Sequence, residues 1–303
     1  MRLTASCGPC RPVLAVDLAA APYARSVTRR WLLFLVALGG AWGAVYPLTT
    51  VGLHAGLSPE WLVALRAVGA AVLLVPFAAA TGALRPLTAR PAAVATAGVI
   101  QAAVPLWLLT TAQQHVSAGV AGILSSLQPV FTAVLVALGG RVGWPVWAGV
   151  GLGATGAALL AGPTGRGTDP AAAIGVIGAA ALFAAGAVFI GRVLPDMPPA
   201  GIAAAAMSLT AVVLLPTAAA VSPHPQFISS GLGAAAGLAV LTAGPLALFY
   251  RLIQDVGAER AALAWYLAPA AALVYDIPLV GLPSPAEIAG LLLVIAALTV
   301  AGR

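Results

Sequence analysis

The sequence predicts an all-α integral membrane protein whose ten transmembrane helices form two inverted five-helix repeats. Three observations lead to this fold class: the apolar composition, ten apolar segments of about 20 residues, and prolines that recur at a fixed interval. Of the 303 residues, 61% are hydrophobic and 7% are charged, whereas soluble domains carry about 25% charged residues. This composition leaves no room for a sizeable soluble domain.

Each of the ten apolar segments is long enough to cross about 30 Å of hydrocarbon as a helix. The expected spans are residues 31–53, 58–80, 91–112, 117–139, 145–163, 170–190, 199–221, 232–252, 261–281 and 284–302. Residues 1–29 are rich in Pro, Ala and Arg, and we expect them to form a disordered cytoplasmic tail. The tail contains Cys7 and Cys10 at the spacing of a redox motif, but without the βαβ context that such a motif needs.

The basic residues predict the orientation of these spans. All 14 of them are Arg, and twelve fall on the side of the N-terminal tail: Arg2, Arg11, Arg25, Arg29, Arg30, Arg85, Arg90, Arg141, Arg192, Arg251, Arg260 and Arg303. The positive-inside rule then places both termini in the cytoplasm. The Ala-, Gly-, Pro- and Arg-rich composition favours a bacterial source and hence a multi-pass protein of the inner membrane. The arginines form no patch interleaved with aromatic residues, so nucleic acid is not an expected partner.

An internal repeat appears when the chain is shifted by 140 residues. Five pairs of prolines then align without a gap: Pro59 with Pro199, Pro76 with Pro216, Pro105 with Pro245, Pro129 with Pro269, and Pro145 with Pro285. The repeats cover residues 31–162 and 170–303. Because five is an odd number of crossings, the two copies enter the membrane in opposite orientations. Many secondary transporters use such inverted repeats for alternating access to a site near the midplane.

Two of the paired prolines, Pro129 and Pro269, fall near the middle of spans 117–139 and 261–281. A proline inside a helix removes a backbone hydrogen bond and breaks or kinks the helix. Broken backbone is tolerated in a membrane where it lines a cavity or is buried in protein. The two related breaks therefore predict a cavity, and kinks that serve packing alone are the alternative.

Polar and aromatic side chains within the spans are the candidates for substrate binding. We expect the following residues to line the substrate path: Trp42, Tyr46, Gln101, Trp107, Ser125, Ser126, Gln128, Tyr250, Trp265 and Tyr266. Aromatic side chains offer apolar walls and cation–π faces for an ammonium group or an amphipathic metabolite. Ordinary packing is the alternative for each aromatic residue, as is an interfacial position for Tyr250.

Arg66 and Asp276 are the two charged residues within the spans. An ionisable residue inside a membrane is by default a functional hypothesis. We expect the two side chains to approach each other or to flank one outward vestibule as an extracellular gate. A proton-carrying role for Asp276 and a fixed structural ion pair are the alternatives. Glu60 and Glu287 begin spans, where an acidic side chain suits the helix dipole.

The sequence gives no reason to expect a metal, a cofactor or a catalytic centre. His54, His115 and His224 are dispersed over predicted outer loops. There is no Walker A sequence, so ATP is not the direct energy source. There is also no His-Glu-x-x-His or Gly-x-Ser-x-Gly sequence. Gly149, Gly153 and Gly156 instead give one span a small face for close helix packing.

Three stretches carry a family resemblance. "WGAVYPLTTVGLHAGLSPEWLVALR" at 42–66 resembles the start of an EamA domain of the drug/metabolite transporter superfamily. "VSAGVAGILSSLQPVFTAVLVALGG" at 116–140 resembles the fourth helix of that domain, and "VGAERAALAWYLAPAAALV" at 256–274 resembles its second copy. The resemblance covers residues 31–303. The Gly-Glu pair usual after the fourth and ninth helices is replaced by Gly139-Gly140-Arg141 and Val280-Gly281-Leu282.

The repeat and the resemblance together predict a secondary transporter that is not an enzyme. We expect it to export small metabolites, such as amino acids or related amphipathic compounds, by alternating access. An intramembrane enzyme acting on lipid or peptide, or a channel, is the alternative. The expected partners are the small-molecule substrate and membrane lipids. The sequence leaves open the substrate, proton coupling against facilitated transport, and the oligomeric state.

Overall fold

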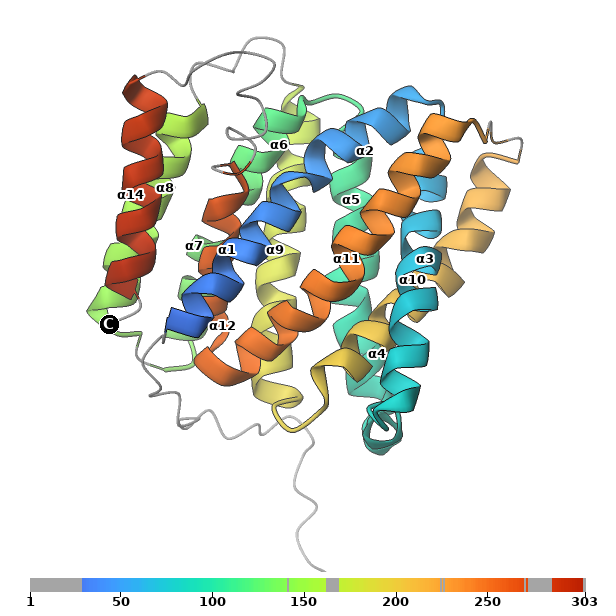
Figure 1. The fold of residues 1–303 in the computed structure, drawn as a ribbon, viewed down its shortest axis with the longest axis horizontal. Helices are drawn as coiled ribbons and strands as arrows, with labels where there is room; N and C mark the ends of the chain where they lie inside the picture. Colours follow the sequence, from blue (N-terminus) through green and yellow to red (C-terminus); the bar gives the residue numbers. More distant parts are fainter. Residues whose placement is uncertain are drawn as a thin grey trace, which may run out of the picture.

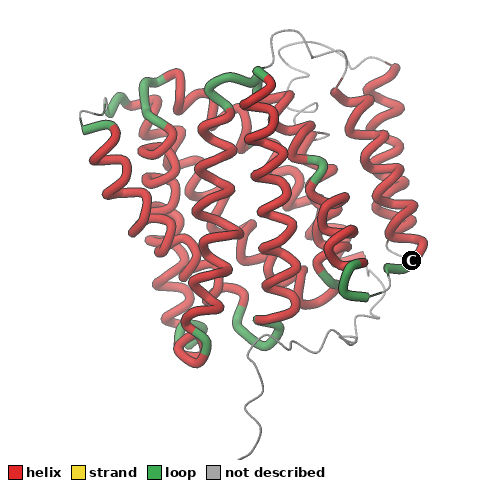
Figure 2. The backbone as a smooth tube through the Cα atoms, turned by 180° about the vertical axis from the view of Figure 1, so that it is seen from behind, coloured by secondary structure: helices red, strands yellow, loops and turns green. Residues whose placement is uncertain are grey.

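The computed structural model describes residues 29–140, 142–161, 169–223, 225, 227–269, 271 and 285–301. Within these ranges the regular structure is helical, and no strand occurs. Figure 2 shows the helices side by side, joined at the two ends of the molecule by short loops. The tail predicted for residues 1–29 lies almost entirely outside the described residues, as does Asp276.

The helices of the first half are α1 (Arg29–Gly43), α2 (Val45–His54), α3 (Pro59–Ala80), η1 (Arg85–Ala89), α4 (Pro91–Gly98), η2 (Val99–Ala103), α5 (Val104–Ala112), α6 (Ala118–Ser125), α7 (Gln128–Ala137) and α8 (Trp144–Ala161). Those of the second half are α9 (Pro170–Val193), α10 (Pro199–Val221), α11 (Ser229–Val256), α12 (Ala258–Ala261), η3 (Ala262–Tyr266) and α14 (Pro285–Ala301). Figure 1 shows α1 beginning and α14 ending at the same face of the bundle.

Seven stretches in the described part of the chain are long and apolar enough to cross a membrane. They are Leu32–His54, Pro59–Ala80, Pro91–Ala112, Ala118–Ala137, Pro170–Val193, Pro199–Val221 and Ser229–Val256. The helices α8 and α14 lie where the fifth and tenth spans were predicted, and the ninth predicted span runs into residues outside the described ranges. The multi-pass membrane architecture is therefore confirmed, and the number of ten spans stays a prediction.

Large apolar side chains cover the outer surface of these helices. Val72 and Phe77 on α3, Val212 on α10 and Val240 on α11 are 57–69% exposed. The buried faces carry mostly small residues instead, as at the contact between α3 and α10, where Ala67 and Ala206 are almost completely buried. This distribution suits lipid outside and close helix packing inside.

Three of the five proline pairs of the repeat occupy equivalent places in the structure. Pro59 and Pro199 lie in the first turns of α3 and α10, where the missing N–H costs nothing because it has no helical partner. Pro76 and Pro216 lie inside the same two helices. Pro145 and Pro285 lie in the first turns of α8 and α14.

The packing of the helices follows the same repeat. α3 packs against α10, and α8 packs against α14, so in both contacts a helix meets its own repeat mate. α2 of the first half packs against α11 of the second half. The equivalent contact with the two halves exchanged lies between α9 and α5, and it is also present. This is the contact pattern that a pseudo-two-fold relation between the halves requires. The glycine face predicted on α8 serves one of these contacts, because a methyl group at Gly156 would lie 2.7 Å from the carbonyl oxygen of Gly290 on α14.

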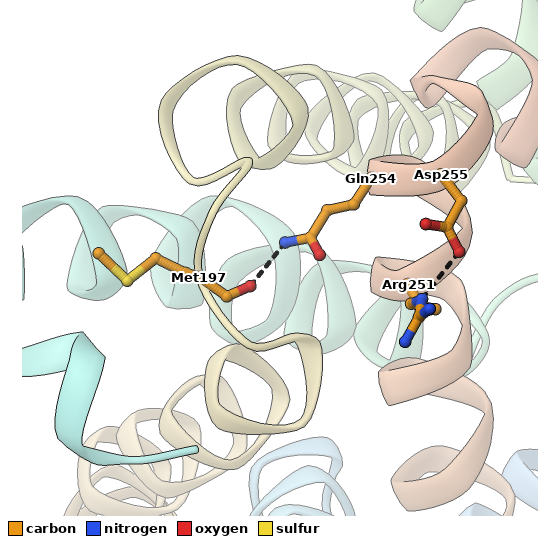
Figure 3. A network of polar contacts seen from close by, with 4 residues as sticks. All are labelled: Met197, Arg251, Gln254 and Asp255. Carbon is orange, nitrogen blue, oxygen red and sulfur yellow. Dashed lines mark hydrogen bonds and ion pairs between the residues drawn. The ribbon is translucent and has the colours of Figure 1, made fainter. Parts of the chain in front are cut away.

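Polar side chains near the end of α11 hold it against the neighbouring loop. The Gln254 side-chain amide donates to the carbonyl oxygens of Leu194 and Met197 at 3.0 and 2.7 Å, which ties the α9–α10 loop to α11. Arg251 and Asp255 form an ion pair of 2.8 Å one turn apart. Figure 3 shows these side chains around the loop. The backbone turns into α12 at Gly257, whose φ of 92° favours glycine.

Candidate functional site

A cavity lies between the two halves of the bundle. Its walls come from α1, α2, α3, η2 and α5 of the first repeat and from α9, α10, α11 and η3 of the second. The cavity and its mouth hold about 560 Å³ of empty volume. The part of this space that a water-sized sphere can occupy is about 40 Å³.

An aromatic cluster forms one wall of the cavity. The rings of Trp42 and Trp265 stack with their centroids 4.5 Å apart. Phe249 meets Trp42 edge-on at 5.1 Å, and Phe183 lies 5.3 Å from Trp265. These four residues come from α1, α9, α11 and η3, so the cluster joins both repeats. Aromatic contacts of this kind make a large apolar surface with fixed ring orientations.

Arg66 supplies the positive charge of the cavity. Its side chain is 6% exposed, and its Nε donates to the Thr242 hydroxyl oxygen at 2.6 Å. The Thr242 hydroxyl in turn donates to the carbonyl oxygen of Leu238 at 2.6 Å. Because Arg66 lies on α3 and Thr242 on α11, this chain of hydrogen bonds crosses the repeat boundary. No carboxylate of the described residues forms an ion pair with Arg66.

Gln101 and Trp265 bring unpaired polar atoms to the same cavity. Gln101 lies on the π-helical turn η2 and is 2% exposed, and its Oε1 has no hydrogen-bond partner among the described residues. The same is true of the indole Nε1 of Trp265. Gly186 of α9 lets η2 approach, because a methyl group there would overlap the Gln101 side chain. Since buried polar atoms are almost always paired, these two atoms are candidates for bonds to a ligand.

Four of the ten predicted path residues line this cavity. They are Trp42, Tyr46, Gln101 and Trp265, together with Arg66, for which a gating role was predicted. The approach of Arg66 to Asp276 stays a prediction, because Asp276 lies outside the described residues. The structure instead surrounds Arg66 with the polar and aromatic walls of a cavity.

Trp107 is not among the residues that line the cavity, and its place on the substrate path stays a prediction. It is 38% exposed, and its Nε1 donates to Glu60 Oε1 at 3.1 Å. The preceding residue, Leu106, does line the cavity, and adjacent residues of an α-helix point about 100° apart. Glu60 lies in the first turn of α3 as predicted, but Ser58 is the capping residue.

Tyr250 and Tyr266 are packing residues instead of cavity residues. Tyr250 is fully buried, one position beyond the cavity residue Phe249. Tyr266 follows Trp265 but faces α8, where its ring covers Gly153 and its hydroxyl donates to the carbonyl oxygen of Val150 at 3.0 Å. Neighbouring positions on one helix face different ways, and a place for these two tyrosines on the substrate path stays a prediction.

The break near Pro129 is present but lies away from the cavity. α6 ends at Ser125 and α7 begins at Gln128, which places Pro129 in the first turn of α7. Ser125, Ser126 and Gln128 are buried, and none of them lines the cavity, so their place on the substrate path stays a prediction. The Ser126 hydroxyl instead donates to the backbone carbonyl of Gly122. In the second copy, the 3₁₀ stretch η3 precedes Pro269, and the residues beyond it are largely outside the described ranges.

Nine cavity residues were not among the sequence predictions: Val45, Ala102, Leu106, Leu109, Phe183, Met207, Thr242, Leu246 and Phe249. Thr242 carried the same signal as Gln101, a polar residue within an apolar span, and the two Phe residues carried an aromatic signal. Nothing in the sequence of these uniformly apolar helices indicated which face turns inward.

A separate charged group lies at the end of the bundle that carries most arginines. Glu259 of α12 lies near Arg192 and Arg260, and burial raises the pKa of its carboxyl while these two arginines oppose the rise. The Arg192 guanidinium donates to the carbonyl oxygen of Val136 at the end of α7. No group of three His, Cys, Asp or Glu side chains in the described ranges could hold a metal ion.

Comparisons with known proteins agree with this architecture. The model of the EamA-like transporter family matches the chain twice, over residues 29–162 and 170–303. One solved structure, described as the crystal structure of a protein, is similar with a TM-score of 0.71 and 17% identity, covering 88% of this chain and 96% of that one. At this identity the similarity shows the fold alone. None of the curated proteins matches the chain. The two family matches include all but 35 residues, and the chain therefore belongs to the EamA-like transporter family.

Proposed function

We propose that this protein is a secondary transporter that exports small metabolites by alternating access through the cavity between its repeats. The observation that carries the proposal is that both repeats line one cavity, and that its lining includes a buried Arg and two residues with an unpaired polar atom, Gln101 and Trp265. In inverted-repeat transporters, one repeat rocks against the other around such a site. A cavity shared by the repeats would open to either side of the membrane as they move.

The walls of the cavity favour a small amphipathic substrate, such as an amino acid or a related compound. Trp42, Trp265 and Phe249 offer apolar surface, while Arg66 and Gln101 offer polar contacts. The packed cluster leaves room for a compact molecule and not for a polymer or a long lipid chain.

The proposed location is the inner membrane of a bacterium, with both termini in the cytoplasm. The arginine distribution supports this orientation, and so does the common face at which α1 begins and α14 ends (Figure 1). Export then moves the substrate from the arginine-rich face to the opposite face.

Untargeted mass spectrometry of culture medium tests the proposal. Four strains are compared: wild type, Trp265→Ala, Trp107→Ala and an empty vector, with equal amounts of protein in the membrane. We expect one class of compounds to accumulate with the wild type and with Trp107→Ala, whose tryptophan lies outside the cavity. Trp265→Ala should lose this accumulation. Equal accumulation with both variants would contradict the assigned cavity, and medium identical to the empty vector in every strain would contradict export.

A further inference from the structure

We propose that Arg66 binds a carboxylate of the transported substrate, and that Thr242 is a positioning residue that holds the guanidinium from the other repeat. This inference rests on the proposed transport function and names the substrate class of the same cavity. The expected substrate is a small molecule with one carboxylate group attached to a compact apolar or aromatic body.

The first step of the argument concerns charge. A cationic side chain inside a membrane protein is costly, so it normally has a partner or faces a polar cavity. Arg66 is buried and faces the cavity, and within the described residues its hydrogen-bond partner is the neutral hydroxyl of Thr242. No carboxylate of the described residues compensates the positive charge. An anionic group in the cavity would compensate it.

The second step concerns geometry. Nε is one of the five N–H donors of an arginine, and here it is taken by Thr242. This bond leaves the two terminal nitrogens, which form the planar fork that binds a carboxylate through two parallel hydrogen bonds. The Thr242 oxygen is itself fixed, because its hydroxyl donates to Leu238 of α11. The orientation of the fork is therefore set by the second repeat, while the charge comes from the first.

The third step concerns why the anionic group is a carboxylate and not a phosphate. Among the described residues that line the cavity, Arg66 is the one that is basic. A single charge balances a monoanion, whereas a dianionic phosphate would bury an excess negative charge against the aromatic walls of Trp42, Phe249 and Trp265. The apolar body of the substrate would lie along these walls, and Gln101 Oε1 would accept a hydrogen bond from a donor group on it.

The test measures binding of four probes to the purified full-length protein in detergent by isothermal titration calorimetry. Phenylacetate carries the carboxylate, phenylacetamide is its neutral isostere, phenethylamine is a cation, and phenyl phosphate is a dianion. Because a charge-assisted pair is worth about 1.5–3 kcal/mol, we expect phenylacetate to bind at least about 10-fold more tightly than each of the others.

Variants assign this preference to its residues. Arg66→Gln should bind acid and amide equally, and Arg66→Lys should keep part of the preference, because an ammonium has charge but no fork. Thr242→Val should weaken phenylacetate binding several-fold without affecting phenylacetamide, and Thr242→Ser should restore it. Arg85→Gln is the control, because Arg85 is exposed on η1 and outside the cavity.

Several results would overturn the inference: equal binding of phenylacetate and phenylacetamide by the wild type, a preference that survives in Arg66→Gln, tighter binding of phenyl phosphate, or no binding of any probe. If Arg66→Gln does not fold, the wild-type comparison and Arg66→Lys decide the question. Preference for phenethylamine would contradict the carboxylate but leave the transporter standing, since export is measured independently in culture medium.

Discussion

The third and eighth predicted spans carry the same proline at equivalent positions, yet the two backbones differ. In the first repeat, α4 ends at Gly98, the chain passes through the π-helical turn η2, and Pro105 lies in the first turn of α5. In the second repeat, Pro245 lies inside α11, which is a single helix of 28 residues. A π-helical turn re-aims the side chains that it carries and is frequent at functional sites. Here it carries Gln101 into the cavity.

The same asymmetry extends to the other polar residues of the cavity. At the positions that correspond to Tyr46 and Arg66, the second repeat has Gly186 and Ala206. Gly186 packs against Gln101 of η2, and Ala206 packs against Gly98 of α4, where an added methyl group would lie 3.3 Å from the Ala206 Cα. The repeat thus uses equivalent positions for two purposes: polar groups that face the cavity in one half and close helix contacts in the other.

The largest functional difference between equivalent positions of the two repeats is expected at Arg66. Arg66→Ala should reduce export of the compound found in the medium by about 30-fold or more, because loss of a buried charge contact costs about 2–5 kcal/mol. The corresponding change in the second repeat, Ala206→Ser, should leave export near the wild-type rate. Similar losses in both variants would mean that Arg66 acts through packing alone.

The second-largest effect is expected on protein stability when Gly186 is replaced. Gly186→Ala places a methyl group on the Gln101 side chain and within 2.9 Å of its Cα. Backbone contacts yield little, so the free energy of unfolding should fall by about 1–3 kcal/mol. Thermal unfolding in detergent measures this loss. Gly151→Ala is the control, because a methyl group at Gly151 meets nothing within 4 Å, and an equal loss in both variants would rule out the proposed contact.

Gln101 sharpens the comparison, because its counterpart in the second repeat is Leu241. Gln101→Leu removes a buried acceptor that has no partner in the described structure. We expect the free energy of unfolding to stay equal or to rise by about 1 kcal/mol, while substrate binding weakens. Gln254→Leu should instead lower stability, because it deletes the two bonds to the α9–α10 loop. Clear destabilisation by Gln101→Leu would show that its amide is paired.

The smallest effect concerns pH. Burial raises the pKa of Glu259, so the folded protein binds this proton more tightly than the unfolded chain. Folding is therefore favoured by this group at low pH, and the contribution is lost as pH rises from the ordinary Glu value through the raised one. Glu259→Gln should flatten the decline of melting temperature with rising pH above about 4.5. An unchanged slope would contradict a buried Glu259.

Much of the fold could be predicted from the sequence because its signals are local. Apolar length identified the spans, and prolines such as Pro59 and Pro199 identified the repeat, because they mark helix starts. The inward faces could not be predicted in the same way. Trp265 and Tyr266 are adjacent and both aromatic, yet one lines the cavity and the other packs on Gly153. In a helix that is apolar all round, no periodicity distinguishes the lipid face from the cavity face.

The central claim is that this cavity is an aqueous path for substrate inside the membrane. Its most direct test is the reactivity of single cysteines toward a water-soluble methanethiosulfonate in membranes, with Cys7 and Cys10 replaced by Ser. Leu246 of α11 lines the cavity, whereas Val240 of the same helix is 61% exposed on the outer, lipid-facing surface. The account predicts that Leu246→Cys reacts from at least one side of the membrane and that Val240→Cys does not react. An unreactive Leu246→Cys beside a reactive Val240→Cys would contradict it.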